Sequence, residues 1–171
     1  MNEICLVGIA GADQSGKSTL AQKFQEHGYF SAEISPILME AGRPLGWNGT
    51  KDNTPFGREF LIRLGMALKQ EFGDEFLVQL TIERAILKGH SLIVVPSIRT
   101  LKESGWILSH GGIMVKIRRP DIEQKTIPLY LEYLEQMLYH YEIVNDKSLE
   151  DFRDSCEIVI SEIEKQEKTH L

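Results

Sequence analysis

The segment from Gly11 to Ser18 reads GADQSGKS and constrains the fold of this chain more than any other part of its sequence. It matches the pattern GxxxxGK[ST], follows an apolar run at residues 4–10 and precedes a helical pattern, which is the context that this pattern requires. Glycines let the backbone curl so that successive N–H groups face phosphate oxygens, and the N-terminus of the following helix adds a positive end. The segment therefore predicts a phosphate-binding loop (P-loop) between a buried strand and a helix, in a chain that binds a nucleoside triphosphate.

Two side chains of this loop have expected roles in binding. Lys17 is expected to reach the β- and γ-phosphates, and the Ser18 hydroxyl is expected to bind Mg²⁺. The expected nucleotide-binding residues are Gly11, Ala12, Asp13, Gln14, Ser15, Gly16, Lys17, Ser18 and Thr19. The alternative is a glycine-rich turn without a ligand, and the order of strand, loop, Lys-Ser pair and helix argues against it.

Composition limits the class of protein. A length of 171 residues with 42% hydrophobic and 26% charged residues predicts one globular domain over residues 1–171. A formal charge of −6 argues against a broad nucleic-acid surface, which needs a basic face. Cys5 and Cys156 lack CxxC spacing, so neither a zinc site nor a disulfide framework is indicated. No run approaches the ~18 apolar residues of a membrane span. We expect a cytoplasmic protein without membrane or nucleic-acid partners, and the sequence leaves its oligomeric state open.

Strands alternate with helical patterns along the rest of the chain. Apolar runs predict strands at residues 4–9, 29–34, 91–95, 112–117 and 141–144. Spacings of three and four between apolar residues predict helices at residues 17–26, 60–87 (divided near Gly73), 101–109, 128–139 and 149–163. The alternation predicts an α/β fold, a three-layer α/β/α sandwich of the P-loop NTPase type around a mostly parallel five-stranded sheet. Residues 42–57 are expected to form a long loop.

The P-loop alone does not identify the reaction, because GTPases, motor and transporter ATPases and small-molecule kinases share it. A GTPase would need an Asn-Lys-x-Asp segment to select guanine, whereas the chain after the last expected strand reads Asn-Asp-Lys-Ser from Asn145. The segment from Leu108 to Gly112 faintly resembles a transporter signature. Its place between a helix and a strand favours a glycine C-cap and a turn instead.

An ordered series of further motifs resembles the phage-type deoxynucleoside monophosphate kinases, which are close in pattern to dephospho-CoA kinases. After the P-loop come Ser35-Pro36-Ile37, Arg58 with the segment Leu61 to Gly65, Pro96-Ser97-Ile98-Arg99 with Glu103, Gly111-Gly112, Arg118-Arg119-Pro120 and Ile143-Val144-Asn145-Asp146. The series extends over nearly the whole chain. The resemblance implies the nucleoside-monophosphate-kinase sandwich, with an acceptor-binding region at about residues 35–75 and a lid at about 118–135.

The resemblance also implies an activity. An ATP-dependent kinase with Mg²⁺ would move the γ-phosphoryl group in line to a small phosphorylated acceptor such as a deoxynucleoside monophosphate. Lys17, Arg118 and Arg119 are the expected catalytic side chains, because lid guanidinium groups can hold the charge that spreads over the equatorial oxygens. Lys125 is a further lid candidate. The alternative for the two arginines is an exposed basic strand end.

On the acceptor side, Ser35, Arg58, Arg63 and Arg99 are expected to bind the substrate, with Lys69 as a further candidate, and Asn145 joins the nucleotide-binding residues. Each of these cations alone could instead belong to a solvated helix face or a surface ion pair. Ser35 is also expected to cap a helix that starts at Pro36, and the cap alone would explain it.

Two departures from the resemblance concern acidic residues. Ser97 stands where the family has an acid that holds Mg²⁺ through water, and an aspartate common near the Ser35 position is also missing. Loss of an outer-shell carboxylate typically costs about 10- to 100-fold in affinity or activity. Glu33 and Asp13 are the nearest replacements, although either could be an ordinary surface acid. The rival interpretation is therefore a nucleotide-binding regulatory or degenerate protein with weak or no turnover, and Ser97 is its best support.

Overall fold

The structure is a computed structural model that describes residues 4–52, 54–124 and 128–169, without the side chains of residues 128–131 and 167–169. Its strands are β1 (Cys5–Gly11), β2 (Phe30–Ser31), β3 (Leu92–Ile98), β4 (Ile113–Arg118) and β5 (Tyr141–Val144). Its helices are α1 (Lys17–Glu26), α2 (Ile34–Gly42), the short 3-10 helix η1 (Arg43–Leu45), α3 (Arg58–Phe72), α4 (Phe76–Leu87), α5 (Leu101–Ser109), α6 (Pro120–Glu123), α7 (Pro128–Gln136) and α8 (Leu149–Thr169).

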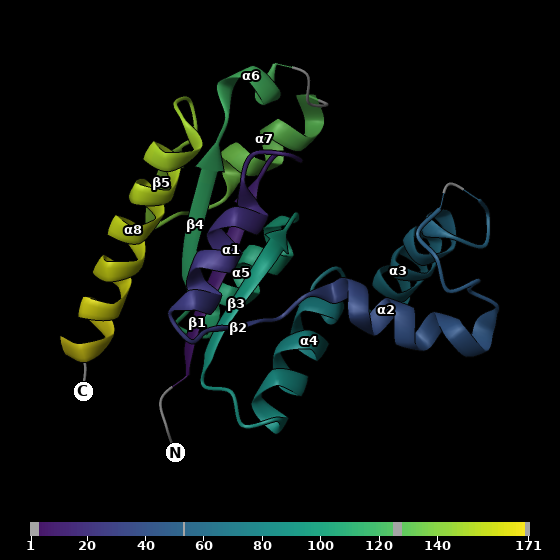
Figure 1. Ribbon diagram of the computed structural model, residues 1–171. Coiled ribbons are helices and arrows are strands. Elements are labelled where there is room, and N and C mark those ends of the chain that lie inside the picture. The colour runs from purple at the N-terminus through teal and green to yellow at the C-terminus, as the bar shows by residue number, and fades with distance from the viewer. Residues whose placement is uncertain (1–3, 53, 125–127, 170–171) are drawn as a thin grey trace.

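The strands form one sheet in the order β2-β3-β1-β4-β5, and the described pairings are all parallel. Helices cover both of its faces (Figure 1). Successive side chains of a strand point to opposite faces, so Val7 and Ile9 of β1 pack with α1 and α8. Leu6 and Ala10 pack on the other face with α4, α5 and α7. The three-layer α/β/α P-loop fold predicted from the sequence is confirmed.

The helices α2 and α3 form an arm at one side of the sheet, next to α4 (Figure 1). The two helices pack closely, because a Cβ atom built on Gly65 of α3 would lie 3.3 Å from the Leu38 side chain of α2. Trp47, in the loop between them, and Leu61 of α3 are buried. The arm contains most of residues 35–75, the part of the chain that the resemblance assigns to acceptor binding.

The chain enters this arm earlier than the sequence predicts. β2 contains only two residues instead of the expected six, because the chain turns into α2 at Ile34. Ser35 is not the cap of this helix, and that expectation is wrong. Glu33 occupies the N-cap position in an extended conformation, with no side-chain hydrogen bond to the helix. Pro36 is accommodated at the third helical position, because the N–H groups of the first turn have no partner within a helix.

The region beyond β4 also differs from expectation. Pro120 begins a single helical turn, α6, which is not among the helices predicted from the sequence, and the fixed φ of proline suits this first position of a helix. α7 ends at Gln136, three residues before its expected end, and α8 continues past residue 163. Lys125 and part of the expected lid lie outside the described residues, so the lid stays a prediction.

The turn predicted after α5 is present. Gly111 has a φ of +73°, and the Gly112 N–H donates a backbone hydrogen bond to the carbonyl of Ile107.

Cys5 and Cys156 are free and buried, and burial raises the pKa of the Cys156 thiol to about 12. Within the described ranges, none of the helices combines the length and the apolar character needed to cross a membrane.

A histidine joins the last helix to the first. His27, at the C-cap of α1, directs Nε2 to Glu157 at 2.8 Å and Nδ1 to Glu164 at 2.9 Å, both on α8. The hydrogen bond with Glu157 is the main reason that the pKa of His27 is raised, and Glu164 raises it further. A raised histidine pKa stabilises the fold fully below the unfolded value of 6.5, and this contribution is lost as the pH rises through the folded value.

We therefore expect His27→Gln to lower Tm by about 2 °C more at pH 6 than at pH 8.5. His110→Gln is the matched control, since His110 is the C-cap of α5 and its ring stacks on Trp106. Thermal unfolding of both variants by circular dichroism at the two pH values tests this. An equal loss for His27→Gln at both values would contradict the assigned role.

Candidate nucleotide and acceptor site

The P-loop has the backbone that its sequence predicts. Gly11 has a φ of +154°, and Gly16, the N-cap of α1, has a φ of +119°. A Cβ atom on Gly11 would lie 2.6 Å from the carbonyl oxygen of Ile117, and one on Gly16 would lie 2.7 Å from the Phe152 ring. Glycine is therefore required at both positions. No side chain caps α1, so its first N–H groups can face an anion.

Lys17 lies inside this loop. Its Nζ donates hydrogen bonds to the carbonyl oxygens of Gly11 at 2.7 Å and Ala12 at 2.6 Å, and it lies 3.9 Å from Oδ1 of Asp13. Burial lowers the pKa of Lys17 to about 8, the Asp13 carboxylate partly opposes this decrease, and the Arg99 charge adds to it. The Lys17 ammonium group therefore lies within the loop that the sequence predicts to bind the phosphates of a nucleotide.

The side chains that directly follow three strands, β3 on one side of β1 and β4 and β5 on the other, hold the loop. Consecutive loop residues receive the three contacts, which run from Arg99 Nη2 to Asp13 Oδ1 (2.9 Å), Arg119 Nη1 to the Gln14 carbonyl (3.1 Å) and Asn145 Nδ2 to the Ser15 carbonyl (2.8 Å). The three donors follow β3, β4 and β5, respectively. They lie close together because the carboxyl ends of parallel strands meet at one edge of a sheet. Arg99, Arg119 and Asn145, which the resemblance selects separately, therefore meet at the P-loop.

The two arginines at the end of β4 have different partners. Arg119 contacts the P-loop through Nη1 and pairs with the exposed carboxylate of Asp121 through Nε at 3.2 Å, whereas Arg118 lies 3.3 Å from Glu123 and 3.7 Å from Glu142. The hydrogen bond with Glu123 is the main reason that the pKa of Arg118 is raised. Arg118 is the last residue of the strand and shares a face with Lys116, which pairs with Glu142 and with the α7 carboxylate Glu135.

One cavity lies between the arm and the end of β3, and a second cavity adjoins it within the arm. The first, of about 330 Å³, has apolar walls that include Leu38, Leu61 and Met66, and polar groups that include Lys69 and Arg99. The other, of about 360 Å³, shares Ser35, Leu38, Leu61 and Ile62 with the first and adds Lys51 and Arg58. Of the four predicted acceptor-binding residues, Ser35, Arg58 and Arg99 line these cavities.

Arg63, the fourth, does not line either cavity. It forms an ion pair with Glu59 one turn earlier on the exposed face of α3. Such pairs are common on helix surfaces and contribute little to stability. Its role in acceptor binding stays a prediction without a structural contact to support it.

Sequence reasoning named Glu103 beside Arg99 in the motif series but missed its role in the site, and its side chain is fully buried. Its Oε2 accepts hydrogen bonds from the backbone N–H groups of Arg99 at 2.6 Å and Thr100 at 3.0 Å. Its Oε1 forms an ion pair with Lys69 of α3. The available signal was Thr-x-x-Glu at residues 100–103, the capping-box pattern, which indicates a bound N3 carboxylate but not its partner on α3.

Both candidate replacements for the missing acid lie beside the site. Glu33 lines the 330 Å³ cavity together with Ser97 and Arg99, and Asp13 lies within the P-loop.

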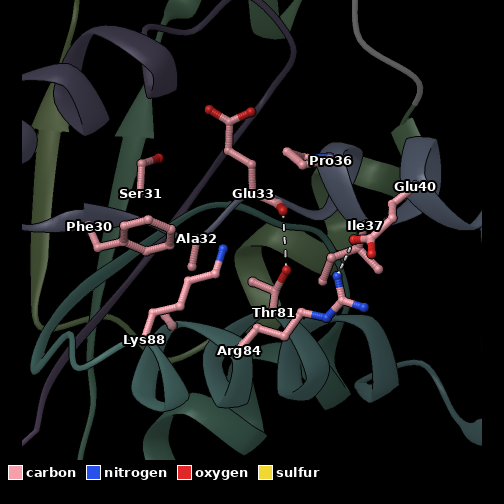
Figure 2. Close-up of a pocket in the computed structure, with 11 residues that line it drawn as sticks. Phe30, Ser31, Ala32, Glu33, Pro36, Ile37, Glu40, Thr81, Arg84 and Lys88 are labelled. Atoms are coloured by element: carbon pink, nitrogen blue, oxygen red, sulfur yellow. Dashed lines mark hydrogen bonds and ion pairs between the residues drawn. The ribbon is translucent and has the colours of Figure 1, made fainter. Parts of the chain in front are cut away.

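Figure 2 shows a separate cavity of about 130 Å³, where Arg84 pairs with Glu40 and the Glu33 carbonyl accepts a hydrogen bond from Thr81. The Glu33 carboxylate points away from Arg84 in this view.

The residues of the loop fit a triphosphate with Mg²⁺. The glycines allow the positive φ angles that curl the backbone, Lys17 supplies a cation, and Ser18 is exposed in the first turn of α1. Mg²⁺ usually takes one or two oxygens from the protein and the rest from phosphates and water. Of the described side chains, no three His, Cys, Asp or Glu residues gather in a group that could hold a metal ion.

Sequence comparisons support a resemblance to P-loop kinases. No protein-family model matches the chain. It is 30% identical over 102 residues to a UPF0200 protein of Thermococcus kodakarensis, which covers 58% of this chain and 51% of that protein. It is 25% identical over 176 residues to the "Putative deoxynucleotide monophosphate kinase" of Acanthamoeba polyphaga mimivirus, covering 86% and 91%. The chain thus spans about half the length of the archaeal relative and most of the viral one.

A solved structure extends the comparison to the fold. The dephospho-CoA kinase of Campylobacter jejuni superposes with a TM-score of 0.58 at 17% identity, over 95% of this chain and 98% of that one. Identity at this level establishes the fold alone. The chain therefore has the three-layer P-loop fold of small-molecule kinases and resembles P-loop kinases in sequence.

Proposed function

We propose that this protein is an ATP-dependent kinase that transfers the γ-phosphoryl group to a small phosphorylated acceptor, of the (deoxy)nucleoside monophosphate type. The observation that carries the proposal is the position of Arg99. The Arg99 guanidinium donates a hydrogen bond to Asp13 of the P-loop at 2.9 Å, and Arg99 also lines the 330 Å³ cavity beside the arm. One cation therefore borders both the expected donor phosphates and the space for an acceptor.

On the donor side, the P-loop amides, the uncapped N-terminus of α1 and Lys17 bind and orient the triphosphate. Bound ATP with Mg²⁺ would supply the phosphoryl group and neutralise part of its charge, with the Ser18 hydroxyl as a ligand of the metal. The Lys17 ammonium would leave the Gly11 and Ala12 carbonyls for the phosphate oxygens, which are stronger acceptors because they are charged.

On the acceptor side, the apolar walls suit a flat base or sugar, and the cations that line the two adjoining cavities suit phosphate. Lys69 is paired with the buried carboxylate of Glu103, so we do not assign it to the acceptor phosphate. We assign that role to Arg99 and Arg58, which also line the cavities. The name of the mimivirus relative supports a deoxynucleotide acceptor.

For the transition state, we assign charge stabilisation to Arg119 and not to Arg118. Arg119 already lies against the P-loop carbonyl of Gln14 and pairs with one exposed carboxylate, Asp121, whereas Arg118 does not contact the loop and is held by two carboxylates. The rival function is a nucleotide-binding protein without turnover. Ser97 favours it, because it leaves the end of β3 without the acid that the related kinases use.

We expect ADP to form from Mg·ATP only when a phosphorylated acceptor is present. A coupled assay with deoxynucleoside and ribonucleoside monophosphates and with dephospho-CoA measures this, and Lys17→Ala is the control that removes the triphosphate-binding cation. ATP binding without turnover for every acceptor would instead support the regulatory protein.

Arg119→Ala should lower kcat by a factor on the order of 10³, the low end for an arginine that stabilises a transferring phosphoryl group, and should change the ATP Kd much less. Arg118→Ala is the matched variant and should keep kcat within about tenfold, because its guanidinium is engaged by Glu123 and Glu142. Single-turnover rates decide the assignment. A larger loss for Arg118→Ala would reverse it.

ATP affinity should fall above pH 8, because phosphate binding needs the charged form of Lys17 and its pKa is about 8. The ATP Kd should rise towards tenfold per pH unit above this value. In Arg99→Gln the rise should begin at a higher pH, because the Arg99 charge lowers the pKa of Lys17. Calorimetry between pH 6.5 and 9.5 measures both profiles, and a flat wild-type profile would refute this role of Lys17.

A further inference from the structure

We propose that Asp13 is a specificity-determining residue that withholds Arg99 from the transfer reaction until the phosphate of the acceptor displaces it. This inference rests on the proposed function, because it concerns the choice between an acceptor and water as the group that attacks ATP. In that unwanted reaction, a water oxygen bonds to the γ-phosphorus while the bond to the β–γ bridging oxygen breaks. The products are ADP, inorganic phosphate and a proton.

The geometry of one carboxylate carries the argument. Oδ1 of Asp13 lies 2.9 Å from Nη2 of Arg99 and 3.9 Å from Nζ of Lys17. Both cations are assigned to ligand phosphates, Lys17 to the donor and Arg99 to the acceptor. The Asp13 carboxylate therefore partly neutralises the two cations that are assigned to bind phosphate.

Arg99 is held in a way that allows this exchange. Its backbone N–H is fixed by the buried carboxylate of Glu103 at 2.6 Å, so the start of its side chain stays at the edge of the acceptor cavity. Its guanidinium is half-exposed, and the Asp13 side chain is 67% exposed. Because Arg99 also lines the cavity, we infer that rotation of its side chain moves the guanidinium from Asp13 to an anion bound there.

The strength of the Asp13–Arg99 pair suits a reversible contact. Ion pairs between exposed side chains are weak, whereas a phosphate monoester carries a charge of about −1.5 to −2 at pH 7 and can accept two parallel bonds from a guanidinium. A bound acceptor phosphate can therefore displace the carboxylate. Water is uncharged and cannot displace the carboxylate, so Arg99 stays paired with Asp13 when ATP is bound without an acceptor.

The test is a double-mutant cycle with Asp13→Asn and Arg99→Gln. With saturating Mg²⁺ and the non-hydrolysable analogue AMPPNP in the donor site, methyl phosphate is titrated into each of the four proteins and followed by NMR. Asp13→Asn should tighten methyl phosphate binding by about three- to tenfold when Arg99 is present, and should have no effect in the Arg99→Gln background. Glu40→Gln, which removes a carboxylate from the distant pair with Arg84, should leave the affinity unchanged.

Equal tightening in both backgrounds would mean that Asp13 merely repels anions, and unchanged or weaker binding would mean that it does not compete for Arg99. Either result overturns the proposal. Asp13→Asn should also raise acceptor-independent ADP formation from Mg·ATP at least threefold, and an unchanged or lower rate would contradict the proposal. If no acceptor supports turnover, the proposed kinase function fails, but the binding cycle still decides whether Asp13 competes for Arg99.

Discussion

The site depends on the common edge at which the parallel strands end. β1 leads directly into the P-loop, and the first residue after each of β3, β4 and β5 directs a polar side chain to Asp13, Gln14 or Ser15. Parallel pairing makes this possible, because every strand in such a sheet ends on the same side. The loop is therefore held by contacts from β3, β4 and β5 and not by its own sequence alone, which preorganises its N–H groups for an anion.

The buried carboxylate of Glu103 extends this arrangement to the arm. It fixes the backbone of Arg99 and pairs with Lys69, so the wall of the acceptor cavity and the arginine that reaches the P-loop share one anchor. A buried charge is costly unless it is paired and fully hydrogen-bonded, and Glu103 meets both conditions through three donors. Its loss would therefore disturb both sides of the site at once.

Much of the fold could be predicted from the sequence because its determinants are local. Apolar spacing gave the limits of α1 and α5, and Gly73 marked the break between α3 and α4. The start of α2 was missed because Pro36 is tolerated at several positions of a first turn. In the site, the P-loop is contiguous and was recognisable, but Arg99 and Asp13 are separated by 86 positions. Sequence also could not tell which of Arg118 and Arg119 faces the loop, because the alternation of a strand does not by itself identify its faces.

The central claim is that Arg99 and Arg119 stand on either side of one phosphoryl transfer. A crystal structure with Mg²⁺, AMPPNP and a deoxynucleoside monophosphate tests it most directly. The account predicts the acceptor phosphate within hydrogen-bond distance of the Arg99 guanidinium, in the cavity lined by Leu38 and Leu61, and Arg119 against the γ-phosphate. An acceptor bound elsewhere on the protein, with Arg99 still paired to Asp13, would contradict it.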